Sequence, residues 1–446
     1  MRVTLGFSMK LNKNTPSLLP NESADLIALV SAAKDLYTKT FSNDIEKGND
    51  LICCAAPGRV NLIGEHVDYT GGYVFPMAIA YSTVCIGRGT IVPKAKSECR
   101  VVSCNKDGNI IQFESGRNMT PLPPGHSDSW TNYVAGVVDQ YQQLLPDEGT
   151  SFSLDIAISG NVPLGSGLSS SASLEVAVAT FLEKLIRTQY PGVNLGGMKE
   201  KALRCQKAEN VFCGSPCGIM DQYVSVAGRE GSAILIDCRN LDIESVEMGG
   251  DERDDKPVFV ICNSNVKHSI GGGEYPVRVR QCTEATKILR DIYGDEVNQL
   301  RDVSIEMLEA ARKREDSVFD DLIYRRARHV VTENLRTLKA KNALIQGQWK
   351  KFGQLMNESH ESMKTDYEVS CEEIDILVDL AQNFDGVYGS RLTGGGFGGC
   401  TVTLVDKSRV HDLCEYMKIE YKKRTGMDCF IFETAPGAGA RELFLR

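Results

Sequence analysis

The sequence lacks two features that often place a protein at a membrane, a long apolar run and a leader segment. No apolar run approaches the ~20 residues that a membrane span requires. The first twenty residues, MRVTLGFSMKLNKNTPSLLP, contain no continuous apolar core of a signal peptide. An excess of basic charge is also absent, because the net charge is -9 and both signs are interspersed. We therefore expect a cytoplasmic protein that binds neither membrane nor nucleic acid.

Paired cysteine spacings are missing as well. The fifteen cysteines are an odd number scattered along 446 residues, a length that does not need disulfide staples. Cys213 and Cys217 are the only close pair near a candidate site, and no second Cys or His pair completes a zinc set. Adjacent Cys53 and Cys54 fall in an expected strand, where they would point to opposite faces. Reduced, mostly buried thiols are the favoured interpretation.

The length and the order of the expected elements indicate the fold class. A chain of 446 residues is longer than one core usually carries, so two domains are expected. Strands and helices alternate without the regular βαβ rhythm of a doubly wound sheet, which predicts an α+β fold. Helical periodicity predicts helices at about 23–40 (capped by Asn21 or Ser23), 170–187, 199–212, within 304–363 and at 408–424. The segments expected to form strands include LICCAA, GYVFPMAIA, STVCIGRGTIV, SLDIAIS, KPVFVICNS and CTVTLVD.

The segment NVPLGSGLSSSASLEV, residues 161–176, places two glycines and three consecutive serines directly before an apolar helical run. N–H groups at a helix start have no partner within the helix, and the helix dipole favours an anion there. Glycines allow close backbone approach, and hydroxyls can donate to phosphate or ligate Mg²⁺. A plain capped helix needs only one serine, so phosphate binding is favoured over a simple turn. No Lys-Ser or Lys-Thr follows the glycines, which excludes a Walker A loop.

A second glycine-rich segment, LTGGGFGGCTVTLV, has G-x-G-x-x-G spacing at Gly394, Gly396 and Gly399. A dinucleotide fingerprint requires a helix after these glycines, and CTVTLV alternates like a strand, so that interpretation is rejected. The alternatives are a tight strand–loop–strand turn and a backbone that approaches a ligand from a second side. The number of glycines favours the second.

A third segment, PGRVNLIGEHVDYTGG, gathers Arg59, Glu65, His66 and Asp68 between glycine turns. Each of these residues, taken singly, is more often a solvated loop charge or an ion-pair partner. Together, and with Asp221 in the otherwise apolar CGIMDQY, they supply the many directional hydrogen bonds that a polyhydroxyl ligand requires. A sugar-binding loop is therefore a competitive hypothesis.

These three segments, in this order, resemble the three motifs of the galactokinases, which belong to the superfamily of homoserine, mevalonate and phosphomevalonate kinases (GHMP kinases). PCGIMDQYVSV, NSNVKHS, EYPVRVRQC and DYEVSC extend the resemblance over about residues 55–405. It implies a two-domain α+β kinase with its active site in the interdomain cleft. The sugar-binding and serine-rich segments would lie in a domain of residues 1–235, and the glycine-rich loop in a domain of residues 236–446.

The resemblance also implies the reaction, which is ATP-dependent phosphorylation of α-D-galactose at O1, giving galactose 1-phosphate and ADP. Asp221 would lie beside the O1 hydroxyl as the base, and Arg59 would neutralise charge next to it and keep it ionised. Sugar hydroxyls would be bound by Glu65, His66 and Asp68. Gly218 and Tyr275 would close the sugar pocket.

For the nucleotide, the resemblance implies that the serine-rich segment wraps the phosphates of ATP and that Ser171 and Glu209 hold Mg²⁺. The phosphate-binding residues would be Gly165, Ser166, Gly167, Leu168, Ser169, Ser170 and Ser171. Trp130 and Leu164 would form walls of the adenine pocket, although Trp130 and Tyr275 could equally be core aromatics. We expect galactose and ATP as the small-molecule substrates of a monomer.

Two alternatives remain at this point. An N-acetylgalactosamine kinase would carry Trp in place of Phe397 and a different loop before Asp221, and this sequence follows the galactose pattern at both. A non-catalytic galactose sensor would have lost part of the serine-rich segment, which is complete here. Departures from the family pattern are Val67 between two expected sugar ligands, three glycines at 271–273 and an acidic loop at 249–256.

Overall fold

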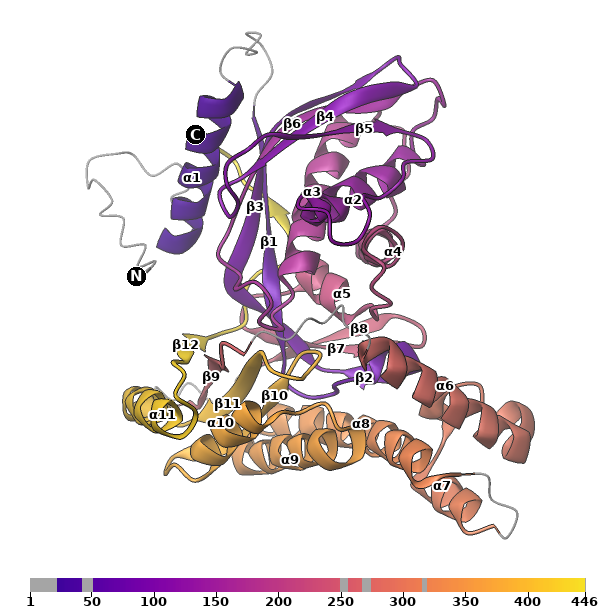
Figure 1. Ribbon diagram of the computed structural model, residues 1–446, viewed down its shortest axis with the longest axis vertical. Helices are drawn as coiled ribbons and strands as arrows, with labels where there is room; N and C mark the ends of the chain where they lie inside the picture. The colour runs from indigo at the N-terminus through magenta and orange to yellow at the C-terminus, as the bar shows by residue number, and fades with distance from the viewer. Residues whose placement is uncertain (1–21, 42–50, 249–255, 267–273, 315–318, 446) are drawn as a thin grey trace.

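A computed structural model describes residues 22–41, 51–248, 256–266, 274–314 and 319–445. Two lobes lie one above the other in Figure 1. The upper lobe is built on a six-stranded sheet and the lower lobe on a four-stranded sheet, with a three-stranded sheet between them. Both lobes mix helices and largely antiparallel strands, so the α+β prediction is confirmed.

The upper sheet has the order β13-β1-β3-β6-β4-β5, and its ladders are antiparallel except for β4 with β6. Its central strand is long and continuous, because the runs GYVFPMAIA and STVCIGRGTIV, predicted as separate, join in one strand from Pro76. The strands are β1 (Ile52–Asn61), β3 (Pro76–Val92), β4 (Lys96–Ser103), β5 (Ile111–Gly116), β6 (Ser151–Gly160) and β13 (Arg441–Glu442).

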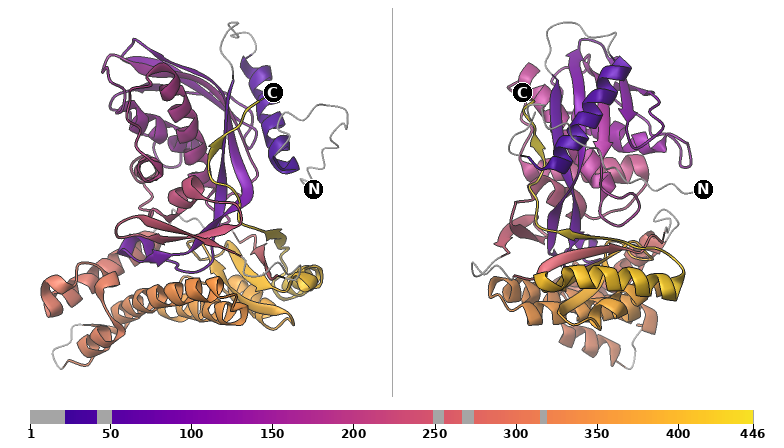
Figure 2. Two further views of the ribbon diagram at one scale, coloured as in Figure 1. Left: turned by 180° about the vertical axis from the view of Figure 1, so that it is seen from behind. Right: turned by 90° about the vertical axis from the view of Figure 1, so that its left-hand side faces the viewer.

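Helices cover both faces of this sheet, as the two views of Figure 2 show. Helix α1 (Ala24–Phe41) covers one face, and the hydroxyl of Ser23 accepts from the N–H of Leu26, as the predicted cap requires. Cys53 joins the core beneath α1 and Cys54 joins the core on the other face, so these neighbours do point apart. That other face is covered by α2 (Asn132–Gln142), α3 (Ser170–Gln189), α4 (Met198–Ala208) and α5 (Met220–Ala227).

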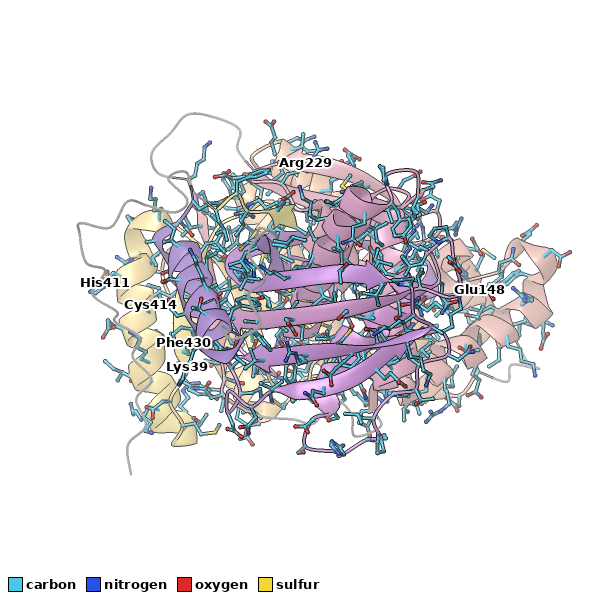
Figure 3. All side chains as sticks on the ribbon, turned by 90° about the horizontal axis from the view of Figure 1, so that it is seen from above. Lys39, Glu148, Arg229, His411, Cys414 and Phe430 are labelled. Carbon is cyan, nitrogen blue, oxygen red and sulfur yellow. The ribbon has the colours of Figure 1, made fainter. Side chains whose placement is uncertain are left out.

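The lower lobe has the strand order β10-β11-β9-β12, with strands Val387–Thr393, Cys400–Val405, Val258–Asn263 and Phe430–Thr434 respectively. Its helices are α6 (Glu274–Tyr293), α7 (Ile305–Arg312), α8 (Asp321–Ile345), α9 (Trp349–Ser362), α10 (Glu372–Gln382) and α11 (Val410–Thr425). From above, His411 and Cys414 of α11 lie on the same side of the molecule as Lys39 of α1, and Glu148 lies on the opposite side (Figure 3).

The three-stranded sheet joins the lobes. It consists of β2 (Tyr73–Val74), β7 (Ser232–Asp237) and β8 (Asp242–Glu247), in the order β2-β7-β8. The predicted domain boundary between residues 235 and 236 falls inside β7, and it stays a prediction. The chain then returns from the lower lobe to the upper one, where β13 pairs with Cys54 and Ala55 of β1.

One predicted helix ends earlier than expected, and several predicted features lie outside the described residues. The helix expected at 199–212 ends as an α-helix at Ala208 and continues as one π-helical turn, Glu209–Cys213. The first twenty residues, nearly all of the acidic loop at 249–256 and the glycines at 271–273 lie outside the described residues. Within the described ranges, no helix has both the length and the apolar character needed to cross a membrane.

Candidate active site

The three segments singled out in the sequence meet backbone to backbone between the lobes. The N–H of Arg59 on β1 donates to the carbonyl of Leu168 in the serine-rich loop at 3.1 Å. That loop, residues 161–169, connects β6 to α3, and the glycine loop, residues 394–399, connects β10 to β11. A Cβ added to Gly394 would lie 2.7 Å from the carbonyl oxygen of Gly167. The glycines therefore permit an approach that a larger residue would block.

A cleft of about 550 Å³ lies where these loops meet. It is lined by most of the residues predicted to form the site: Arg59, Glu65, His66, Asp68, Gly165, Ser166, Gly167, Ser169, Ser170, Ser171, Glu209, Gly218, Asp221 and Tyr275. The side chain of Leu168 is not among them, because it is fully buried in the core beneath the loop. Arg59 is the only Lys or Arg among the described residues that line this cleft.

Arg59 and Asp221 form a bidentate ion pair at the floor of the cleft. Asp221 stands in the first turn of α5, and its two carboxylate oxygens accept from Nε and Nη2 of Arg59 at 2.8 Å each. Nη1 of Arg59 donates to the carbonyl of Gly167, and the side chain of Asp221 stays 27% exposed. A charge-assisted pair of this geometry fixes both side chains and leaves the carboxylate open to a ligand.

The first turn of α3 is left open toward the cleft. Its N-cap residue, Ser169, has φ 60° and ψ 51°, in the left-handed region that non-glycine residues rarely adopt. Its hydroxyl donates to Asp221 and caps no N–H of the helix. Unpaired N–H groups and the positive end of a 20-residue helix thus point at the space lined by Ser170 and Ser171, as an anion requires.

Two carboxylates lie beside this helix start. Glu209 begins the π-helical turn and lines the cleft together with Ser171. Burial and the nearby charge of Asp221 raise the pKa of Glu209 to about 7. Behind it, Glu175 of α3 is fully buried, and Nε2 of Gln222 joins the two, 2.7 Å from Glu209 and 3.1 Å from Glu175.

This donor set fits Mg²⁺. Mg²⁺ prefers oxygen ligands and is usually held by one or two carboxylates together with substrate phosphates and waters. Ser171 and Glu209 supply a hydroxyl and a carboxylate on one wall of the cleft, and Oε1 of Glu175 has no hydrogen-bond partner. In the described ranges, no three His, Cys, Asp or Glu side chains converge as a complete metal site. Phosphate oxygens and waters would therefore have to complete the coordination.

The carboxylates of the sugar-binding loop have unusual environments. Burial and the charges of Asp221 and Glu65 raise the pKa of Asp68 to about 7. Gly218 lies directly against it, since a Cβ there would come within 1.7 Å of Oδ2 of Asp68. Burial also raises the pKa of Glu65, whereas the positive charges of Arg391 and Arg59 act to lower it. Oε1 of Glu65 accepts from the N–H of Gly394 at 2.8 Å, which ties this loop to the glycine loop.

Helix α8 supports the sugar-binding loop from below. Oε1 of the buried Glu333 accepts from the N–H of Gly64 at 2.9 Å, and Nε2 of His329 lies 3.1 Å from the carbonyl of Glu65. Glu333 and His329 were not predicted from the sequence as site residues, and neither were Arg391, Glu175 and Gln222. The only signal for the pair on α8 was their spacing of four residues, which places polar side chains on one face of a helix.

An apolar pocket of about 150 Å³ adjoins the cleft at Ser170 and Ser171. Trp130 and Leu164 both line it, and Leu164 is 63% exposed. Tyr133, which was not predicted as a site residue, lines both this pocket and the main cleft. An exposed leucine beside a tryptophan, next to an anion-binding helix start, suits a flat aromatic base attached to phosphates.

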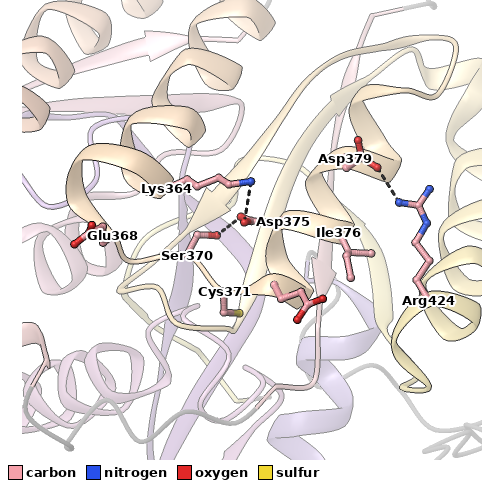
Figure 4. Close-up of a pocket in the computed structure, with 9 residues that line it drawn as sticks. Lys364, Glu368, Ser370, Cys371, Asp375, Ile376, Asp379 and Arg424 are labelled. Carbon is pink, nitrogen blue, oxygen red and sulfur yellow. Dashed lines mark hydrogen bonds and ion pairs between the residues drawn. The ribbon is translucent and has the colours of Figure 1, made fainter.

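A larger groove, of about 640 Å³, lies elsewhere, between α10 and the end of α11 (Figure 4). Its cations are already paired: Lys364 contacts Asp375 at 3.0 Å and Arg424 contacts Asp379 at 2.8 Å. Ser370 also donates to Asp375, at 2.6 Å. The groove therefore offers a ligand little uncompensated charge, and the cleft between the lobes remains the candidate active site.

Comparison with known families agrees with this geometry. Residues 35–88 match the profile described as "Galactokinase galactose-binding signature". Residues 132–229 match "GHMP kinases N terminal domain", and residues 340–423 match "GHMP kinases C terminal". The three matches contain the sugar-binding loop, the serine-rich loop with Asp221, and the glycine loop respectively.

Whole-chain comparisons give the same result. The galactokinase of Bos taurus is 43% identical over 396 residues, covering 88% of this chain and 92% of that protein. That of Mannheimia succiniciproducens is 42% identical over 395 residues, covering 88% of this chain and 95% of that protein. The crystal structure of Lactococcus lactis galactokinase complexed with galactose superimposes with a TM-score of 0.79 at 33% identity, covering 93% of this chain and 100% of that one.

Proposed function

The chain belongs to the galactokinase family of the GHMP kinases and is a kinase that phosphorylates galactose, and we propose that the cleft transfers the γ-phosphoryl group of ATP to O1 of α-D-galactose. The products are galactose 1-phosphate and ADP. The observation that carries the proposal is the Arg59–Asp221 pair, which stands where the serine-rich loop, the sugar-binding loop and α5 meet.

Asp221 is the proposed base. Its exposed carboxylate edge accepts the proton of the O1 hydroxyl as that oxygen attacks phosphorus. The guanidinium of Arg59 and the hydroxyl of Ser169 hold the carboxylate in one orientation. Phosphoryl transfer depends mainly on positioning and charge neutralisation, so an oriented carboxylate is the main chemical group the protein needs to supply.

The sugar-binding loop orients the hexose. Glu65 and Asp68 are proposed to bind its hydroxyls through their carboxylates and His66 to line the pocket between them, with Gly218 and Tyr275 closing it. Their support is that all five line the same cleft as Asp221. The absence of a side chain at Gly218 leaves the Asp68 carboxylate free to face the sugar.

The serine-rich loop binds the nucleotide. The open first turn of α3, with the backbone of Gly165–Ser171, is proposed to wrap the triphosphate, and the base would enter the pocket lined by Trp130 and Leu164. Ser171 and Glu209 would hold Mg²⁺, which, when bound, neutralises charge on the phosphates.

The experiment is an ADP-release assay with Mg²⁺-ATP and a panel of hexoses that includes galactose, glucose, 2-deoxygalactose and N-acetylgalactosamine. Turnover highest with galactose is expected. Preference for N-acetylgalactosamine would overturn the proposed substrate, and ATP binding without turnover of any sugar would favour the non-catalytic sensor.

A further inference from the structure

A continuous series of hydrogen bonds runs beside the cleft through residues from separate parts of the chain. The thiol of Cys282 on α6 lies 3.1 Å from the hydroxyl of Tyr367, which lies 2.6 Å from the hydroxyl of Tyr69. The Tyr69 hydroxyl lies 3.0 Å from Nδ1 of His66, and Nε2 of His66 lies 3.2 Å from the carbonyl oxygen of Gly395. We call these residues, Cys282, Tyr367, Tyr69, His66 and Gly395, the Tyr69 network.

The hydrogen bond at the Gly395 end of the network determines which group donates and which accepts in every other bond. A carbonyl oxygen can only accept, so His66 must carry its proton on Nε2 to bond Gly395. Nδ1 is then an acceptor and receives the hydroxyl proton of Tyr69. Tyr69 must therefore accept from Tyr367, and Tyr367 in turn accepts from the thiol of Cys282. Both nitrogens of the His66 ring thus have a hydrogen-bond partner, and each donor in the network has one acceptor.

The network is built of neutral groups. Cys282 and Tyr367 are 2% and 0% exposed. Burial raises the pKa of Cys282 to about 11 and the pKa of both tyrosines well above their usual value. Burial, followed by the neighbouring His329, lowers the pKa of His66 to about 3. Near pH 7 the thiol and the two hydroxyls therefore keep their protons, and the His66 ring carries a single proton. The donor and acceptor roles described above apply at this pH.

Its position connects two walls of the cleft. His66 lies between Glu65 and Asp68 on the sugar-binding loop, and Gly395 belongs to the glycine loop. The ring of Tyr275 packs against His66 and Tyr69, with ring centres 5.6 and 5.3 Å away. A change in the orientation of His66 would therefore move groups on both loops.

We infer that Tyr69 and Tyr367 are positioning residues for galactose: they hold the His66 ring, as its Nε2–H tautomer, between the sugar-binding loop and the glycine loop. The inference rests on the proposed function, because it takes galactose as the ligand of this wall. Neither tyrosine is a predicted ligand of the sugar, and both act through His66. Their effect falls with distance along the network from His66.

Steady-state kinetics test the order of effects. Tyr69→Phe leaves Nδ1 without a donor and should raise the KM for galactose about tenfold, which corresponds to about 1.4 kcal/mol. The kcat and the KM for ATP should stay within about twofold. Tyr367→Phe should raise the galactose KM about threefold and Cys282→Ala less than about twofold, with Cys282→Ser restoring the wild-type value.

A matched control and a stability measurement separate positioning from folding. Tyr293→Phe removes a half-buried hydroxyl that donates to the carbonyl of Met307 at 2.7 Å, away from the cleft, and should leave the galactose KM unchanged. The melting temperatures should rank the variants in a different order from the galactose KM. Tyr367 is the more buried of the two tyrosines, so Tyr367→Phe should lose the most stability. A galactose KM that follows the loss of stability, or a silent Tyr69→Phe, would overturn the inference.

A spectroscopic measurement tests the network without activity. In a ¹⁵N-histidine spectrum at pH 7, with His66 assigned by its absence in His66→Gln, we expect the Nε2–H tautomer and a hydrogen-bonded Nδ1. In Tyr69→Phe the Nδ1 signal should move toward that of a free imine nitrogen. An Nδ1–H tautomer in the wild type would overturn the network even in an active enzyme. The expected spectrum in a protein that does not use galactose would contradict the proposed function alone.

Discussion

Ser169, the N-cap residue of α3, donates its hydroxyl to the carboxylate of Asp221 and caps no N–H of its own helix. An N-cap serine normally satisfies one of the open N–H groups, so this arrangement leaves the helix start available to an anion. The same hydroxyl helps to orient the proposed base. One side chain in a left-handed conformation thus acts both at the open start of α3 and at the carboxylate of Asp221.

The role of Ser169 can be separated from its backbone strain with two variants. Ser169→Ala and Ser169→Gly both remove the hydrogen bond to Asp221, and we expect each to lower kcat about tenfold. Only the alanine keeps a Cβ at φ 60°, so the glycine variant should have the higher melting temperature of the two. Equal kcat in wild type and both variants would show that Asp221 needs no help from this hydroxyl.

Asp221→Asn should remove the proposed base and keep the shape of the site. We expect kcat to fall about 10²-fold or more, while the affinity for galactose, measured by calorimetry, changes less than about tenfold. Asp379→Asn, which alters an exposed ion pair in the groove of Figure 4, is the control and should leave kcat unchanged. Full activity of Asp221→Asn would dismiss Asp221 as the base.

The KM for galactose should fall as the pH rises from 6 to 8. The pKa of Asp68, raised to about 7 by burial and by Asp221 and Glu65, leaves a large protonated fraction below pH 7. The ionised form, which accepts from sugar hydroxyls, therefore increases roughly fivefold to tenfold across this range. Measurements at saturating Mg²⁺-ATP isolate this effect from the nucleotide side.

In Asp68→Asn, by contrast, the galactose KM should be high and flat over the same pH range. A variant that kept the wild-type pH dependence would assign the titration to another group.

Glu209 and Glu175 should respond differently to the same substitution. Burial, followed by the charge of Glu209, raises the pKa of Glu175 well above its usual value, so the loss of charge in Glu175→Gln should disturb the site little. We expect it to keep activity within about twofold. Glu209→Gln should raise the Mg²⁺ concentration needed for half-maximal activity at least about tenfold. Equal effects of the two substitutions would argue against Glu209 as the metal ligand.

Two neighbouring glycines of the glycine loop should also differ. A Cβ at Gly395 meets no protein atom within 4 Å, whereas one at Gly394 would lie 2.7 Å from a backbone oxygen of Gly167, at φ 87°. Gly394→Ala should therefore lower the melting temperature. Gly395→Ala should leave it almost unchanged but raise a substrate KM, because the methyl group enters the cleft. Unaltered kinetics in Gly395→Ala would place the ligand elsewhere.

Local patterns predicted the parts of the site that the chain builds from contiguous residues. Serines and glycines before an apolar run indicated the open start of α3, and the alternation after Gly399 indicated strand β11. Both patterns reflect the backbone conformation that a short segment must adopt. That conformation depends on the residues of the segment itself, so it can be predicted locally.

The supporting residues were not predictable in this way. Arg391, Glu333 and Tyr367 meet the sugar-binding loop only because distant elements fold together, and each has an ordinary place in its own segment. Helix α8 follows normal amphipathic spacing, and nothing local shows that Glu333 is fully buried against Gly64. Such contacts are set by tertiary packing.

The pairing of β13 with β1 has a consequence for folding during synthesis. Residues 441–442 complete the upper sheet beside Cys54 and Ala55, Leu443 joins the core under α1, and Arg441 forms an ion pair with Glu22 at 2.6 Å. During synthesis on the ribosome, the edge of β1 must therefore stay unpaired until nearly all of the following sequence has emerged. The lobe whose translation begins first is thus finished last, and affinity tags or truncations at the carboxyl end act on the strand pair at the edge of its sheet.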